Sequence, residues 1–265
     1  MYNLILADLF KLRKSLAMKI LFAITSLSAV AMTVIAYLIP QGKIDQNLIS
    51  IGFMFSDVNI ISIVGAVIAG VYICGDFENK TIQDAVANGI SRGTVIVSKA
   101  IVFSLGVFFI LLPYVIITIF ALSSGAAFSM GALAVGLLNI LTTEAGVTLT
   151  AFGTMKLVGI MFLIVLVYTA QLSICIPLAL MLKKPVLVVP IYYGLSILFA
   201  QLSKALASST VMDRLFSITP FGGKHMFLTL QAGAGDILKT LFVSLFFILF
   251  MIVLAYSGFR RAEIK

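Results

Sequence analysis

Long uninterrupted apolar runs constrain this chain more than any other feature. Of its 265 residues, 62% are hydrophobic and only 11% are charged, whereas soluble domains have roughly 45–50% and about 25%. Several runs reach the ~20 residues that a helix needs to cross a bilayer. The runs are continuous rather than alternating, which favours helices over a membrane barrel. The sequence therefore predicts an all-α membrane protein.

Six runs are candidate transmembrane helices of a single transmembrane domain, 1–265. The predicted spans are residues 20–39, 58–74, 100–122, 157–182, 186–202 and 237–258. A further apolar stretch, 131–141, is interrupted by Thr142-Thr143-Glu144 and is too short to cross, so we expect an interfacial or half-inserted helix there.

The N-terminal segment 1–17 has its own pattern. Ile5, Leu9, Leu12 and Leu16 recur at helical spacing, with charged residues between them. This spacing predicts an amphipathic interfacial helix with its cations toward the lipid headgroups. The alternative is a plain basic flank to the first span.

The positive charges indicate how the chain is oriented. Segments 1–19, 75–99, 183–184 and 259–265 hold 12 of the 18 Lys and Arg residues, and the segments on the opposite side hold 6. Because cytoplasmic loops carry the excess of basic residues, both termini are predicted to be cytoplasmic.

The cations flank apolar runs and form no stripe, so no nucleic-acid partner is expected. Cys74 and Cys175 fall inside spans and are predicted to be reduced, packed thiols.

Residues 75–99 form a strongly polar interval between the second and third spans. Thr81 followed by Asp84 resembles a helix start, in which a hydroxyl caps free amides and an acid occupies the first turn. Gly89 can end that helix in the left-handed conformation, and Ser91 can cap the next helix. We therefore predict a short surface helix from about Thr81 to Asn88. The plain alternative is a solvated loop with no partner.

The same residues resemble a known family. Phe77-Glu78-x-x-Thr81, Gly89-x-Ser91-Arg92 and Ser98-Lys99 are similar to the first cytoplasmic loop of ABC-2-type exporter permeases, in particular those of bacitracin and lantibiotic self-protection transporters. The basic end, Phe259 to Lys265, is similar to the tail of that family.

The resemblance implies a permease subunit of a bacterial plasma-membrane exporter for antimicrobial peptides or drugs. Its partners would be a separate ATP-binding cassette subunit, a second permease copy or homologous permease, and membrane lipids. The docking residues that it implies are Phe77, Glu78, Asn79, Lys80, Thr81, Asp84 and Arg92.

The resemblance also implies an outer gate. In that family the segment before the last span folds back into the membrane, and residues 203–236 match it in position. Pro220-Phe221-Gly222-Gly223 is the natural turn, because Pro fixes one backbone angle and Gly permits a positive φ. An ordinary external loop in water is the alternative.

Motifs for chemistry within the chain are missing. No G-x-x-x-x-G-K-[ST] phosphate loop occurs, so ATP would have to bind the partner subunit and the chain needs no cofactor of its own. No metal-ligand spacing and no catalytic motif appear, which argues against an enzyme.

We expect Gln171 to form a helix–helix hydrogen bond rather than a substrate contact. The single histidine, His225, is expected to be a solvated loop side chain.

Two other classes of function stay open. One is a carrier or channel without an ATPase, although few ionisable residues sit at span centres, where such carriers usually place them. The other is a membrane-embedded enzyme or a non-transporting immunity or assembly protein.

Overall fold

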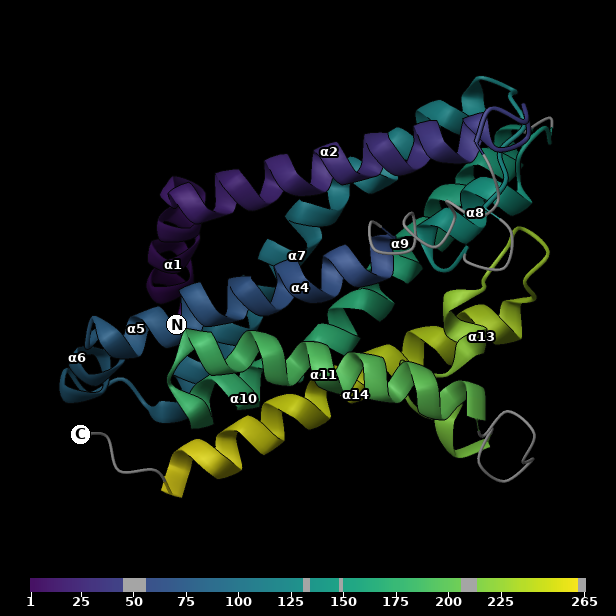
Figure 1. The fold of residues 1–265 in the computed structure, drawn as a ribbon. Coiled ribbons are helices and arrows are strands. Elements are labelled where there is room, and N and C mark those ends of the chain that lie inside the picture. The colour runs from purple at the N-terminus through teal and green to yellow at the C-terminus, as the bar shows by residue number, and fades with distance from the viewer. Residues whose placement is uncertain (45–55, 131–133, 148–149, 206–213, 262–265) are drawn as a thin grey trace.

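The computed structural model describes residues 1–44, 56–130, 134–147, 150–205 and 214–261, and all regular structure in these ranges is helical (Figure 1). The helices are α1 (Tyr2–Lys14), α2 (Leu16–Leu38), α4 (Asp57–Ala69), the π-helix η2 (Gly70–Cys74), α5 (Gly75–Glu78), α6 (Thr81–Ala87), α7 (Arg92–Ser123), α8 (Leu137–Thr143), α9 (Ala151–Leu172), α10 (Cys175–Leu182), α11 (Pro185–Ala205), α13 (Gly223–Met226) and α14 (Ala234–Arg261).

Six helical stretches of the described chain are long and apolar enough to cross a membrane, which confirms the all-α, six-span prediction. They are Leu16–Leu38, Asp57–Glu78, Arg92–Ser123, Ala151–Leu182, Pro185–Leu202 and Ala234–Arg260. The third and fourth begin earlier than residues 100 and 157. The reason is local: the hydroxyls of Ser91 and Thr150 accept hydrogen bonds from the amides of Thr94 and Gly153, so each helix starts at a cap that precedes its apolar run.

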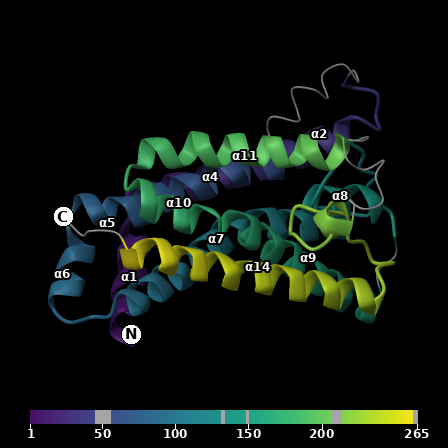
Figure 2. The ribbon, with the colours of Figure 1, turned by 90° about the horizontal axis from the view of Figure 1, so that it is seen from below.

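The spans in the middle of the chain form the centre of the bundle. Helix α4, α7 and the α9–α10 pair are largely buried, whereas α2, α11 and α14 lie on the outside. Helix α2 packs against α7, and α11 packs against α4. Figure 2 shows α10 between α11 and α14, both of which it contacts. On α14, Phe242, Phe246, Leu249 and Val253 are exposed at helical spacing, as expected for a face that meets lipid.

The bundle has two distinct ends. We call the end that holds α1, α5, α6 and the last turn of α14 the terminal face, and the end that holds α8 the far end (Figure 1). The start of α1 and the end of α14 lie on the terminal face, and residues 262–265 of the predicted basic tail fall outside the described residues.

Helix α1 runs crosswise to α2 at the terminal face (Figure 1). A sharp bend at Ser15, whose backbone is extended (φ −60°, ψ 128°), separates the two helices. Two charged side chains of α1 contact the rest of the bundle. Asp8 is buried, and Lys11 forms an ion pair with Asp76 of α5. The placement of α1 in a membrane interface stays a prediction.

Candidate functional site

The short helix predicted after the second span is present as α6. It ends at Asn88 with Gly89 in the left-handed conformation (φ +85°). The Gly89 amide donates to the Val86 carbonyl and the Ile90 amide to the Ala85 carbonyl, which is the Schellman arrangement. The predicted stop is therefore confirmed in detail, and the chain turns tightly into Ser91, the cap of α7.

Helix α6 starts at Thr81, as predicted, but the predicted capping role of the Thr81 hydroxyl is wrong. Lys80 occupies the N-cap position, in the left-handed region (φ 58°), and no side chain caps the helix. The Thr81 hydroxyl instead donates to the backbone carbonyl of Asp76 (3.2 Å). Thr81 thus fastens α6 to α5 rather than capping its own helix.

Most of the docking residues implied by the sequence lie together on the surface. Helices α5 and α6 project beyond the bundle at the terminal face (Figures 1 and 2). Glu78, Asn79, Lys80, Thr81 and Asp84 are all exposed there. Ile82 is the apolar anchor of the helix, with 1% of its surface accessible. The arrangement presents a small charged surface on a helix that is held from below.

The other two residues of the implied set face inward. Phe77 is buried and packs edge-on against Phe259 of α14, with ring centres 6.0 Å apart. Lys183, in the turn between α10 and α11, lies over the same Phe77 ring at 5.5 Å. Arg92 donates to the backbone carbonyls of Phe259 and Arg260. Phe77 and Arg92 therefore join the projecting segment to the ends of other spans.

A charge cluster that the sequence did not predict joins α5 to α1 and α7, and three of its four members are buried. It consists of Asp8 on α1, Lys11 on α1, Asp76 on α5 and Lys99 on α7. The Lys99 amine donates to Asp8 Oδ1 (2.8 Å) and also to Asp76, while Lys11 pairs with Asp76. Tyr72 of η2 adds its hydroxyl 3.4 Å from Lys99 Nζ.

The charge cluster joins three elements that are distant in sequence. Its two acids and two lysines balance formally, so each buried carboxylate has a cation beside it. Lys99 and Asp76 have only 4% and 2% of their side chains exposed, although both were counted as part of a polar loop. A buried ionic contact of this kind specifies one arrangement of α1 against the second and third spans.

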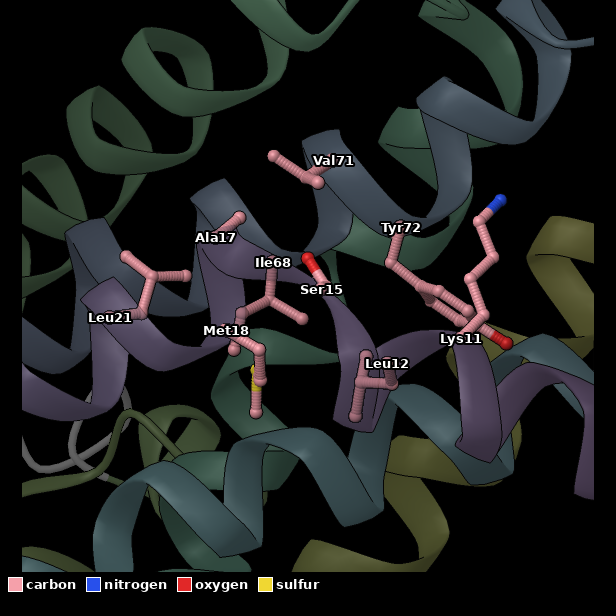
Figure 3. A pocket seen from close by; sticks show the side chains of 9 residues that line it. All are labelled: Lys11, Leu12, Ser15, Ala17, Met18, Leu21, Ile68, Val71 and Tyr72. Atoms are coloured by element: carbon pink, nitrogen blue, oxygen red, sulfur yellow. The ribbon is translucent and has the colours of Figure 1, made fainter.

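A small cavity lies beside the charge cluster, at the bend between α1 and α2. It has a volume of about 40 Å³, which exceeds the 10–15 Å³ that one water requires. Figure 3 shows Lys11 and Tyr72 at one side of it, with Ser15, Ile68 and Leu21 around the rest. The cavity is too small for a substrate and is suited to hydrating the nearby charges.

A second group of sequence-predicted residues lies in a turn that enters the bundle. The buried Gln171 side chain on α9 donates to the Pro220 carbonyl (2.8 Å). Phe221 stacks on Phe199 of α11 at 4.5 Å and meets Phe247, at the middle of α14, edge-on at 6.1 Å. Gln171 therefore binds the backbone of the turn, where a helix–helix hydrogen bond was expected. Through Phe221 the turn also contacts the middle of α14.

The glycine in this turn is required for a different reason from the one predicted. Gly222 has φ −62°, so it does not use a positive φ. A Cβ at Gly222 would lie 2.7 Å from the Phe216 carbonyl oxygen, which is closer than real Cβ contacts. Close backbone approach thus selects glycine here. Gly223 begins the short helix α13.

His225 is buried, with 3% of its surface accessible, so the expectation of a solvated side chain is wrong. Its Nε2–H donates to the Ser217 carbonyl (3.0 Å), and its Nδ1 accepts from the Thr240 hydroxyl of α14 (2.8 Å). Burial away from water lowers the pKa of His225 below its usual 6.5, and the positive charge of Lys239 acts in the same direction. The neutral imidazole fastens the turn to the last span.

Asp57 is another buried acid that the sequence did not single out. Its Oδ2 accepts hydrogen bonds from the Tyr168 hydroxyl (2.8 Å) and the Leu137 amide (2.9 Å), so it caps the N-terminus of α8. Gly136 leads into α8 with φ +63°. Helix α8 has seven residues and does not cross, as predicted, but it is buried in protein; residues 131–133 of the predicted stretch lie outside the described part.

The described residues contain no group of three or more His, Cys, Asp or Glu side chains that could hold a metal ion. Cys74 and Cys175 are both buried and free, as predicted. No protein-family model, no curated protein and no solved structure matches this chain. The residues of the terminal face and of the turn at 214–226 are therefore the basis for a functional interpretation.

Proposed function

We propose that this chain is the membrane-spanning permease subunit of an ATP-binding-cassette exporter that removes antimicrobial peptides or drugs. The observation that carries the proposal is α6, a short exposed helix that projects from the terminal face between the second and third spans. The resemblance of its flanking residues to exporter permeases gives this helix its role. It docks on a separate ATP-binding subunit, where ATP binds.

The terminal face offers a direct path for movement from such a partner. A force on α6 passes through the Thr81–Asp76 hydrogen bond and the Phe77 ring to α5, and from Asp76 to Lys99 at the start of α7. The same acid contacts Lys11, so α1 moves with the two spans. In this proposal the terminal face is cytoplasmic in a bacterial plasma membrane, and a second permease copy or a homologous permease completes the pathway.

The turn at 214–226 is the proposed outer gate. The Phe221 ring lies between Phe199 and Phe247, two residues of different outer spans. Separation of α11 from α14 would release this ring, because the aromatic contacts to both helices cannot then be kept. Pro220 and Gly222 hold the backbone in the reversed path that places the ring there.

Docking is tested with charge reversals on α6. We expect Glu78→Lys combined with Asp84→Lys to abolish co-purification of an ATP-binding subunit with the tagged full chain from its native membranes, and to abolish efflux. Both side chains are exposed, so the permease should fold normally. Asp236→Lys, a single charge reversal on the exposed start of α14, is the control to which Glu78→Lys and Asp84→Lys are also compared one at a time. Unchanged association and efflux in the double variant would rule out α6 as the docking element.

The gate is tested with Phe221→Ala, compared with Phe227→Ala. Phe227 is 49% exposed in the same segment and stands apart from the aromatic contacts of Phe221. We expect only Phe221→Ala to change efflux at equal protein levels in the membrane. Normal efflux by the Phe221 variant would show that the turn is structural.

A further inference from the structure

An open groove runs between α1, α2 and α7 on the outside of the bundle. Its volume is about 580 Å³, and its walls are mostly apolar, with Leu12 of α1, Phe22 of α2, and Phe108 and Phe109 of α7 among them. The Phe22 and Phe109 rings are stacked at 5.0 Å. The volume lies within the 300–1,000 Å³ usual for small-molecule sites.

Two cations that flank the bend at Ser15 in sequence line this groove. Arg13 comes from the last turn of α1 and Lys19 from the first turn of α2, and both are exposed. The lining contains no acid, and neither cation forms an ion pair with an acid in the described part of the chain. An apolar groove with two cations in its wall is complementary to an anion that carries a hydrocarbon chain.

We propose that this groove is a binding site for an anionic phospholipid. One acyl chain lies along Phe22, Phe108 and Phe109, and the phosphate lies between Arg13 and Lys19. Basic pockets between membrane helices recognise anionic headgroups in this way. A helix from a second copy fits the observations less well, because an apolar helix would leave the two cations without a counter-charge.

The site adds a role for α1. This helix carries Asp8 and Lys11 into the charge cluster, and its neighbouring residues Leu12 and Arg13 line the groove. A lipid in the groove therefore contacts α1, α2 and α7 together, beside the charge cluster. This inference is independent of whether α6 docks on an ATPase.

The absence of tryptophan from the chain permits a direct test. Phe109→Trp places a single indole in the groove wall, and the full-length protein is reconstituted with phosphatidylglycerol or phosphatidylcholine carrying brominated acyl chains, which quench tryptophan fluorescence. We expect stronger quenching by brominated phosphatidylglycerol. Phe120→Trp is the control, because Phe120 is 70% exposed on α7 and is not among the groove-lining residues. Its indole should show no preference between the two lipids.

The cations are tested in the Phe109→Trp protein with Arg13→Gln and Lys19→Gln together. We expect the preference for the anionic lipid to fall about 30-fold in affinity, because each basic residue near a membrane surface contributes roughly fivefold. Lys14→Gln with Lys43→Gln removes equal charge outside the groove and should leave the preference intact.

Three results would overturn the proposal. Equal quenching of the Phe109→Trp protein by both lipids would show general lipid exposure. A preference that survives the Arg13 and Lys19 substitutions would place the headgroup elsewhere. An indole in the groove wall that neither brominated lipid quenches would show that protein, such as a second copy of the chain, covers the groove.

Discussion

Removal of the Lys99 amine should destabilise the protein more than any surface substitution. Lys99 is 3% exposed and is the cation shared by Asp8 and Asp76. In Lys99→Met, Asp76 keeps Lys11, but Asp8 keeps only hydroxyl partners such as Ser98, at 3.4 Å. Breaking a buried ion pair from one side costs about 3–5 kcal/mol, because an uncompensated charge stays in the interior.

The double variant separates this explanation from simple loss of packing. Asp8→Asn removes the charge that Lys99→Met leaves behind, so the pair of substitutions should cost about 2 kcal/mol less than the sum of the two single changes. The measurement is the free energy of unfolding in mixed micelles titrated with sodium dodecyl sulfate, for all four members of the cycle. Lys14→Met, on the exposed side of α1, is the control and should leave the unfolding curve in place.

Two outcomes would refute the reasoning. If the free energy of unfolding of Lys99→Met is within about 0.5 kcal/mol of the parent value, the charge cluster does not hold α1. If the costs of Lys99→Met and Asp8→Asn simply add, the two side chains are not energetically coupled.

Three further predictions concern the far end and the turn at 214–226. Gly136→Ala should lower the free energy of unfolding by about 2–6 kcal/mol in the same titration, because φ is positive there and the new Cβ would collide with the Tyr168 hydroxyl. Gly125→Ala is the control and should cost only about 1–2 kcal/mol, because φ is similar but no atom lies within 4 Å of the new Cβ. Asp57→Asn should cost about 1–3 kcal/mol, because Oδ2 accepts from Tyr168 and Leu137 while Oδ1 accepts from the Val58 amide, and the NH₂ group of Asn cannot accept the last of these. The pKa of His225 is lowered in the folded state, so the stability that its neutral form contributes is complete above pH 6.5 and is lost as the pH falls through the folded pKa. His225→Gln should remove this sensitivity to acid. The measurement is the rate of protease cleavage within the turn between about pH 7.5 and 5.

The features that sequence could predict are those encoded locally. Each span is an apolar run with its own length, and the end of α6 depends only on Gly89 and the few residues around it. The position of the turn before the last span could be predicted as well. Its aromatic neighbours could not, because Phe199 and Phe247 meet Phe221 only after α11 and α14 have packed.

The charge cluster shows why the remainder could not be predicted. Asp8 and Lys99 are separated by 91 positions, and nothing near either residue indicates its partner. Asp76 and Lys99 border apolar runs, where charged residues usually meet water or headgroups, so a surface position was the reasonable expectation. Only the crosswise path of α1 brings Asp8 over them.

The π-helix η2 has a consequence for how the second span can vary in length. Each residue of an α-helix turns the chain by about 100° and advances it about 1.5 Å, and a π turn contains one residue more than an α turn. Deleting one residue between Gly70 and Cys74 would therefore convert the π turn into an α turn, and Asp76 would still face Lys99. The same deletion in α4 (Asp57–Ala69) would rotate everything after it by about 100°, and Asp76 would point away from Lys99. An insertion or deletion in this span leaves the charge cluster intact only if it preserves the direction in which Asp76 points. The angular position of one carboxylate, as well as the thickness of the bilayer, thus limits how many residues the span can contain.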